Sequence, residues 1–129
     1  MSWYIDSSAI LKFVFDEQER PALLKTLTDA PVTSEIARLE VKRTVSRINP
    51  EDLDLASEEL AKVRIVDLSK SVLSTAESFA ANVTLGSLDA IHVATAIQFG
   101  SEIEGMITYD KQMAKNAYNL GIRVLSPGA

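Results

Sequence analysis

The sequence predicts a single α/β domain, a three-layer arrangement in which a central parallel sheet is flanked by helices on both faces. Short segments of β-branched and aromatic residues alternate with longer segments of helical periodicity, which indicates β-α-β units. A chain of 129 residues suits one domain, and about two-thirds of its unfolded surface can be buried on folding. No repeat, low-complexity tract or linker divides the chain, so residues 1–129 are expected to form one unit.

Five segments are expected to form the strands. Each is short, rich in β-branched or aromatic residues, and placed between two segments with helical signals. The last strand is ended by Pro127, because proline cannot donate a hydrogen bond to a sheet. The expected strands cover residues 3–5, 31–33, 64–68, 105–108 and 122–125.

The segments between the strands carry start and stop signals of helices. Pro21 suits a first helical turn, Ser34 is a favourable N-cap, and Gly121 is suited to the position just after a helix. The segment 88–99 is apolar almost all round, so that helix is expected to be buried. The expected helices cover residues 9–15 with Ser7 or Ser8 as cap, then 21–27, 35–48, 50–63, 69–82, 88–99 and 111–120.

Composition excludes several classes of protein. Without cysteine the chain has no disulfide, no cysteine-bearing zinc site and no thiol nucleophile, and its single histidine rules out a multi-histidine metal site in one chain. The first residues lack the basic and apolar regions of a secretory signal, and no apolar run approaches the ~20 residues that span a bilayer. We therefore expect a soluble, cytoplasmic protein without membrane association. Its net charge of −5 argues against a nucleic-acid clamp that binds through a basic surplus.

Acidic residues follow two of the expected strands. In open parallel sheets, functional sites form beyond the carboxyl ends of the strands. Asp6 follows the first strand and Asp110 follows the fourth, and the segment from Ser34 onward follows the second. Each aspartate also suits an ordinary helix N-cap, so this placement alone allows a structural role as well as a functional one.

Two further acids lie on expected helices. At about 100° per residue, Glu40 falls on the border of the apolar stripe of its helix, where a carboxylate needs a compensating partner. An ion pair with Lys42 or Arg43 is the ordinary explanation. Asp89 lies in the first turn of the helix expected to be buried, where the helix dipole favours an acid. A cation at the head of that helix would offset the cost of burying it.

These four carboxylates indicate a definite chemistry if they converge. Like charges within about 4 Å of one another cannot all ionise without a counter-cation. Oxygen ligands without histidine or cysteine select hard ions such as Mg²⁺ or Mn²⁺. Such an ion can activate a water and neutralise charge on a phosphoryl oxygen, which is the chemistry of phosphodiester hydrolysis. It would also let an acidic protein approach a polyanion.

Four stretches and the C-terminal tail together match the pattern of a known family over essentially the whole chain. They are Tyr4-Ile5-Asp6-Ser7-Ser8-Ala9 with Lys12, Thr33-Ser34-Glu35-Ile36-Ala37-Arg38-Leu39-Glu40-Val41 with Arg43, Leu88-Asp89-Ala90-Ile91-His92-Val93-Ala94-Thr95-Ala96, Ile107-Thr108-Tyr109-Asp110 and the tail from Gly121 to Gly128. Through them the chain resembles the PIN-domain nucleases, specifically the VapC-type toxin ribonucleases.

The resemblance implies an endoribonuclease that depends on Mg²⁺ or Mn²⁺. It also implies attack of water on an RNA phosphodiester, which leaves a 5′-phosphate and a 3′-hydroxyl. Its catalytic and metal-binding acids map onto the acidic quartet, Asp6, Glu40, Asp89 and Asp110, with Asp6 and Asp89 as the principal ligands. The hydroxyl residues that flank the family's site map onto Ser8 and Thr108.

The resemblance further implies partners. Such toxins usually form homodimers, and a small antitoxin from the adjacent gene usually blocks the site and brings DNA-binding ability. Five basic residues neighbour the quartet and are interpreted either as RNA-phosphate contacts or as plain solvated surface: Lys12, Lys42, Arg43, Lys111 and Lys115. His92, one helical turn from Asp89, is expected to be a packed residue of the core or beside the site rather than a proton carrier.

Two other functions are kept as alternatives. A phosphoacceptor receiver domain has a similar length, fold class and acidic pocket, but it normally shows an adjacent acidic pair after the first strand and a lysine near the end of the last. Here Ser7 and Ser8 follow Asp6, and residues 123–127 contain no lysine. A catalytically silent PIN-like binding module is the other alternative, against which the presence of all four acids argues.

Overall fold

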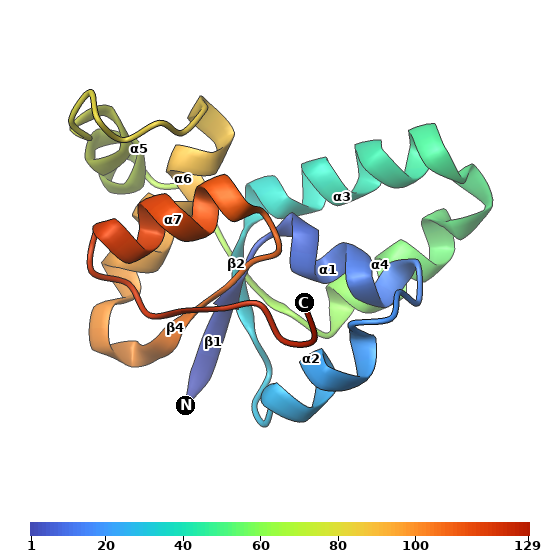
Figure 1. Ribbon diagram of the computed structural model, residues 1–129. Coiled ribbons are helices and arrows are strands. Elements are labelled where there is room, and N and C mark those ends of the chain that lie inside the picture. Colours follow the sequence, from blue (N-terminus) through green and yellow to red (C-terminus); the bar gives the residue numbers. More distant parts are fainter.

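A computed structural model describes all 129 residues, and it contains one sheet of five parallel strands in the order β3-β2-β1-β4-β5 (Figure 1). The expected α/β class is confirmed. In chain order the elements are β1 (Ser2–Ile5), α1 (Ser7–Val14), α2 (Arg20–Thr26), β2 (Val32–Ser34), α3 (Glu35–Ile48), η1 (Pro50–Asp52), α4 (Leu53–Ala61), β3 (Arg64–Val66), α5 (Lys70–Glu77), α6 (Ser87–Phe99), η2 (Gly100–Glu102), β4 (Ile103–Ile107), α7 (Lys111–Asn119) and β5 (Val124–Leu125).

Strand β1 shows how the sheet is covered on both faces. Trp3 and Ile5 belong to a core cluster with residues of α1, α3 and α4, whereas Tyr4 belongs to a second cluster with residues of α6 and α7. This alternation follows from the two-residue period of a strand. Figure 1 shows the same division, with α1 to α4 on one side of the sheet and α5 to α7 on the other. The central strands are thus buried on both faces, as is usual for parallel sheets.

The order of the strands places a switch point between β1 and β4. The chain builds outward from β1 through β2 and β3, then returns to the other side of β1 for β4 and β5. Ile5 at the end of β1 is in register with Ile107 at the end of β4. Ligands of open α/β sheets bind outside the strand ends at such a point. This order differs from the 2-1-3-4-5 order of receiver-type folds, which argues against the receiver alternative.

Several element boundaries differ from those expected, for local reasons. Helix α1 begins at Ser7 because Asp6, rather than Ser7 or Ser8, is its N-cap. Strand β3 ends at Val66 because the amide of Leu68 donates to the Glu35 carboxylate at 2.5 Å instead of extending the sheet. Helix α5 ends at Glu77, where the hydroxyl of the next residue, Ser78, donates to a backbone carbonyl of the last turn at 2.7 Å.

Helix α6 is not buried along its whole length, which corrects the expectation of an entirely buried helix. Its buried stretch runs from Ala90 to Ala96. The first turn is open: the side chain of Leu88 is exposed and that of Asp89 is half-buried. The N-terminal end of α6 therefore meets solvent at the same edge of the sheet as the ends of β1 and β4. None of the helices is both long and apolar enough to cross a membrane.

Candidate active site

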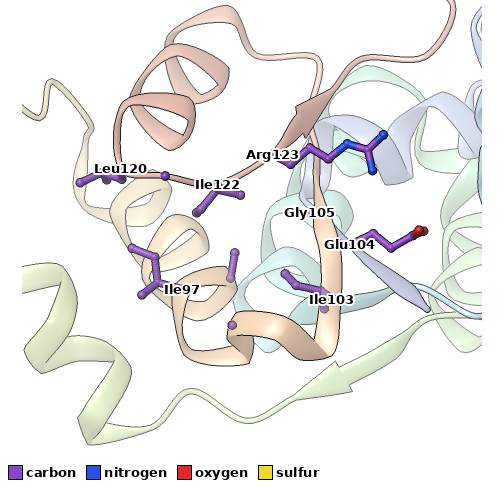
Figure 2. Close-up of a pocket in the computed structure, with 10 residues that line it drawn as sticks. Ile97, Ile103, Glu104, Gly105, Leu120, Ile122 and Arg123 are labelled. Carbon is purple, nitrogen blue, oxygen red and sulfur yellow. The ribbon is translucent and has the colours of Figure 1, made fainter.

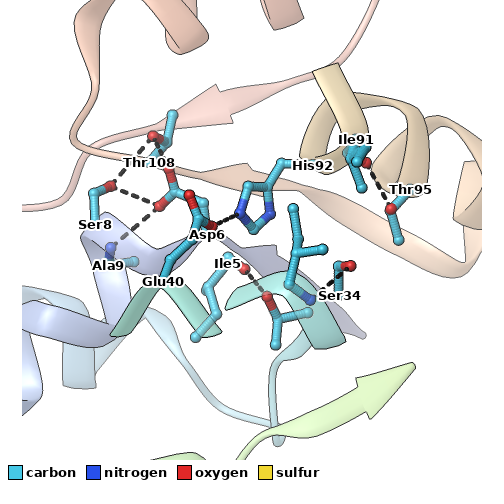
Figure 3. A network of polar contacts seen from close by, with 12 residues as sticks. Ile5, Asp6, Ser8, Ala9, Ser34, Glu40, Ile91, His92, Thr95 and Thr108 are labelled. Carbon is cyan, nitrogen blue, oxygen red and sulfur yellow. Dashed lines mark hydrogen bonds and ion pairs between the residues drawn. The ribbon is translucent and has the colours of Figure 1, made fainter. Parts of the chain in front are cut away.

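Asp6 is the most deeply buried acid at the carboxyl edge of the sheet, with 2% of its surface exposed. Its Oδ1 accepts hydrogen bonds from the Ser8 hydroxyl at 2.6 Å and from the Ala9 amide at 3.2 Å, and its Oδ2 accepts one from the Thr108 hydroxyl at 2.6 Å (Figure 3). Burial raises the pKa of Asp6, and nearby His92, followed by these hydrogen bonds, opposes that rise only in part. All three donors are neutral, so they orient the carboxylate without cancelling its charge.

The hydroxyls of Ser8 and Thr108 have fixed directions. Ser8 Oγ accepts from the Tyr109 amide at 2.9 Å, and Thr108 Oγ1 accepts from the Asp110 amide at 3.1 Å. Because these backbone groups can only donate, each hydroxyl is free to direct its own proton to Asp6. Both hydroxyls that the sequence singled out therefore contact the carboxylate directly and tie the end of β1 to the end of β4.

The carboxylate of Glu40 is held by a histidine. His92 is completely buried, and its Nε2 lies 2.6 Å from Glu40 Oε1 (Figure 3). The ordinary explanation of Glu40 as an ion-pair partner of Lys42 or Arg43 is therefore wrong, since Lys42 donates to Ser57 of α4 at 2.6 Å and Arg43 forms no ion pair. The expectation for His92 as a packed residue is confirmed. Local sequence patterns could not predict its bond to Glu40, because the two residues are 52 positions apart.

Asp89 and Asp110 complete the quartet. The carboxylate of Asp89 accepts no hydrogen bond and forms no ion pair, whereas Asp110 is exposed and caps α7 by accepting from the Met113 amide at 2.9 Å. Partial burial raises the pKa of Asp89, and the negative charge of Asp110 raises it further. His92 opposes this rise, while Glu40 and Asp6 add smaller increases. The structure thus brings the four acids close enough for their charges to interact.

No lysine or arginine forms an ion pair with any member of the quartet. Of the five basic residues proposed from the sequence, Lys12 is occupied by Glu17 at 2.9 Å and Glu19 at 3.2 Å. Burial opposes the charge on Lys12, but the hydrogen bonds of these two acids outweigh it and raise the pKa of the lysine. The other basic residues without an acidic partner are Lys42, which binds a hydroxyl, and Arg43, Lys111 and Lys115, which are exposed.

The donor atoms at this edge fit a hard divalent cation. They are carboxylate and hydroxyl oxygens with a single imidazole, and this set favours Mg²⁺ or Mn²⁺ over softer metals. In the structure, however, no three histidine, aspartate or glutamate side chains are grouped closely enough to hold one ion. The quartet is therefore gathered at one edge without forming a coordination sphere.

A cavity lies at the other end of β4 and contains none of the quartet. It has a volume of about 340 Å³ and is lined by parts of α6, the start of β4 and the turn before β5 (Figure 2). Gly105 is required there, because a Cβ at this position would lie 2.3 Å from the carbonyl oxygen of Arg123. This cavity offers one acid and one arginine, Glu104 and Arg123, and nothing that would bind a metal.

Comparison with known proteins agrees with this architecture. The family model of the PIN domain matches residues 3–118. The chain belongs to the PIN-domain family. This PIN-domain protein is similar to three curated proteins of Mycobacterium tuberculosis: ribonuclease VapC35 (33% identical, 97% of this chain and 96% of the relative covered), ribonuclease VapC47 (34%, 98% and 97%) and ribonuclease VapC46 (36%, 96% and 96%).

Two solved structures share the fold of the PIN-domain protein. A chain of a toxin–antitoxin complex from Klebsiella pneumoniae superimposes with a TM-score of 0.76 at 21% identity, with 98% of each chain covered. VapC20 of Mycobacterium tuberculosis, a sarcin–ricin loop cleaving toxin, superimposes with a TM-score of 0.71 at 13% identity, with 95% of this chain and 97% of the other covered. At these identities the likeness concerns the fold alone.

Proposed function

We propose that this PIN-domain protein is an endoribonuclease that depends on Mg²⁺ or Mn²⁺ and acts as the toxin of a toxin–antitoxin pair. The chain matches its curated relatives over nearly their whole length, and these relatives are ribonucleases. Ribonucleases of this family generally depend on a divalent metal ion. The observation that carries the proposal is the acidic quartet itself. Four interacting carboxylates lie at the switch point of the sheet, and no lysine or arginine neutralises them.

Each member of the quartet has a part in the proposed reaction. Asp6 and Asp89 would hold the ion, while Glu40 and Asp110 would complete its surroundings or hold a second ion. When bound, the ion orients a water and neutralises charge on the phosphoryl oxygen. Ser8 and Thr108 fix Asp6 by donating to its two oxygens. The expected products are a 5′-phosphate and a 3′-hydroxyl.

The exposed basic residues near the quartet are proposed to bind the RNA backbone. Lys111 and Lys115 lie on α7, which Asp110 caps, and Arg43 lies on the same helix as Glu40. All three are exposed and have no acidic partner, so they are available to phosphates. Lys12 is a weaker candidate because two glutamates already hold it. Lys42 is weaker too because its ammonium is bound to Ser57.

The partners are proposed to be a small antitoxin encoded by the adjacent gene and a second copy of this chain. One structural neighbour is a toxin–antitoxin complex, which supports the first. Exposed leucines on three neighbouring helices, Leu39 of α3, Leu73 of α5 and Leu88 of α6, are consistent with an apolar contact surface for a homodimer. The proposed location is the cytoplasm, where RNA and the antitoxin are made.

The test of the ribonuclease is cleavage of labelled RNA by the purified protein. EDTA should abolish cleavage, and added Mg²⁺ or Mn²⁺ should restore it. Cleavage that persists in EDTA would contradict the metal site. A complete absence of cleavage with either ion, on total cellular RNA, would favour the silent binding module instead.

The toxin role needs a separate experiment. Induced expression of the chain should arrest growth, and co-expression of the neighbouring reading frame should relieve the arrest. An Asp89→Asn variant expressed to the same level serves as the control, because it should not arrest growth. Normal growth on induction of the active enzyme would argue for a different role in RNA processing.

A further inference from the structure

A series of hydrogen bonds runs from the backbone of β2 through two buried side chains to Glu40. The Ser34 amide donates to the hydroxyl oxygen of Tyr4 at 3.2 Å, and that oxygen lies 2.6 Å from Nδ1 of His92. His92 Nε2 then lies 2.6 Å from Glu40 Oε1 (Figure 3). Tyr4 and His92 are both completely buried, so water does not compete for these bonds.

The bond between His92 and Glu40 has a definite direction. An ionised carboxylate can only accept, so Nε2 carries a proton and donates it to Oε1 of Glu40. At the other ring nitrogen, the oxygen of Tyr4 accepts from the Ser34 amide and lies within hydrogen-bond distance of Nδ1. Tyr4 thereby holds the imidazole ring in the orientation that directs Nε2 at Glu40.

This bond is the only polar contact that holds the Glu40 carboxylate. No lysine or arginine pairs with it, and its second oxygen has no hydrogen-bond partner. A single N–H donor orients the carboxylate and leaves its second oxygen open to another ligand. The arrangement therefore suits a carboxylate that must be placed accurately and that also binds a second partner.

We propose that Tyr4 and His92 are positioning residues, which place the Glu40 carboxylate at the strand-end site through the Nε2–H group of His92. The inference rests on the proposed function, because the part of Glu40 in the nuclease site is itself a proposal. It adds two buried residues that act on the site through Glu40, held in turn by the backbone amide of Ser34.

The proton on Nε2 can be observed without any activity assay. His92 is the only histidine of the chain, so its imidazole signals in a long-range ¹H–¹⁵N correlation spectrum are unambiguous. In the metal-free wild-type protein, the spectrum should show a proton on Nε2. An unprotonated Nε2 would overturn the proposal.

Two tyrosine variants test whether Tyr4 holds the imidazole. Tyr4→Phe removes the hydroxyl at Nδ1 and should move the ¹⁵N signal of that nitrogen. Tyr109→Phe is the matched control, because the hydroxyl of Tyr109 also makes a hydrogen bond, to the Pro127 carbonyl at 2.7 Å, but has no contact with His92. This control should leave the imidazole signals unchanged. Unchanged signals in Tyr4→Phe would remove Tyr4 from the arrangement.

Two substitutions of His92 separate positioning from packing. His92→Gln retains an N–H donor near the place of Nε2, whereas His92→Leu fills the volume without a donor. Loss of a group that orients a metal ligand costs about 10–100-fold in metal affinity or activity. We expect that loss in kcat and in Mn²⁺ affinity for His92→Leu, with KM for RNA little changed, and a substantial recovery of both in His92→Gln.

The outcomes distinguish the inference from the proposed function. Equal losses in His92→Gln and His92→Leu would assign His92 a packing role and overturn the inference, as would wild-type values in both. A wild-type protein that cleaves no RNA would defeat the proposed function, while Mn²⁺ affinity by electron paramagnetic resonance and the proton on Nε2 would still test the positioning of Glu40. If His92→Leu does not fold, the wild-type spectrum and the Tyr4→Phe spectrum decide the question.

Discussion

The acids that follow α1 and the acids at the carboxyl edge of the sheet are held by opposite kinds of partner. Glu17 and Glu19 both bind the ammonium of Lys12, at 2.9 and 3.2 Å, and nearby Asp16 pairs with Arg20 at 3.2 Å. The quartet has only hydroxyl, amide and imidazole donors, supplied to three of its members. One group of acids is paired with lysine and arginine within the chain, and the other has no such partner.

This difference separates a structural role from a functional one. A salt bridge such as that of Lys12 needs nothing from outside the protein, and such partly exposed pairs contribute little to stability. Acids that are brought together without lysine or arginine partners repel one another. Burial raises the pKa of both Asp6 and Asp89, and this repulsion raises that of Asp89 further. An external cation is what relieves the repulsion, so the quartet is the place where a metal ion is expected.

The largest effect is expected on catalysis when one of the principal ligands is neutralised. Asp6→Asn and Asp89→Asn should each reduce metal-dependent RNA cleavage by more than about 100-fold, the upper range for residues that only orient a ligand. Circular dichroism should show that both variants keep the fold. Glu17→Gln is the matched control and should cleave RNA at the wild-type rate. Wild-type cleavage by both aspartate variants would remove them from the site.

Metal binding should also stabilise the fold through the quartet. At a Mg²⁺ concentration about 100 times its dissociation constant, the free energy of unfolding should rise by about 2.7 kcal/mol, because only the folded state gathers the four acids. Urea denaturation with and without Mg²⁺ measures this. The double variant Asp6→Asn with Asp89→Asn should show almost no increase. The same increase in that variant would place the bound ion elsewhere.

Removal of the Tyr4 hydroxyl tests the cost of losing a neutral donor. Tyr4→Phe should destabilise the protein by about 1–3 kcal/mol, since the buried Ser34 amide and His92 Nδ1 lose their partner. Tyr109→Phe loses one partly buried hydrogen bond and should cost about 0.5–1.5 kcal/mol. Chemical denaturation of the two variants compares them. A smaller loss in Tyr4→Phe than in Tyr109→Phe would contradict the hydrogen-bond series.

The raised pKa of Asp6 should make the free energy of unfolding fall as pH rises through the acidic range. Burial raises the pKa of Asp6 above its unfolded value of about 3.9, so between these two values the folded state binds more protons than the unfolded state. This carboxyl therefore contributes a loss of stability as pH rises through that window. Thermal unfolding across the acidic range gives the free energy of unfolding of the metal-free wild type and of Asp6→Asn. The difference between the two isolates the contribution of this carboxyl. A difference that is flat or rises with pH would contradict it.

The smallest effect is expected at the salt bridge of Lys12. Glu17→Gln should change the free energy of unfolding by less than about 1 kcal/mol, because the glutamate is largely solvated and Lys12 retains Glu19. Added salt should reduce the effect further. A loss of several kcal/mol would mean that these acids are as tightly constrained as the quartet.

Patterns in the sequence are enough to predict the class of fold and the identity of the candidate acids. Its signals are local: Ser34 caps α3, which spans residues 35–48 as expected, and Gly121 follows α7 with the positive φ of 91° that glycine adopts freely. The family pattern also selected Asp110, which looks like an ordinary cap by every local criterion. Setting the quartet aside leaves fourteen acidic residues against thirteen basic ones, so most of the net charge of −5 belongs to one site.

The groups that hold those acids are set by contacts between distant parts of the chain. The bond from Thr108 to Asp6 joins residues 102 positions apart, and that from His92 to Glu40 joins residues 52 positions apart. Helical spacing suggested Lys42 or Arg43 as partners of Glu40, because periodicity describes neighbours on one helix and not those on the helix packed against it. The pairing of β1 with β4 and the packing of α6 beside β2 bring these partners together, and no local pattern encodes that proximity.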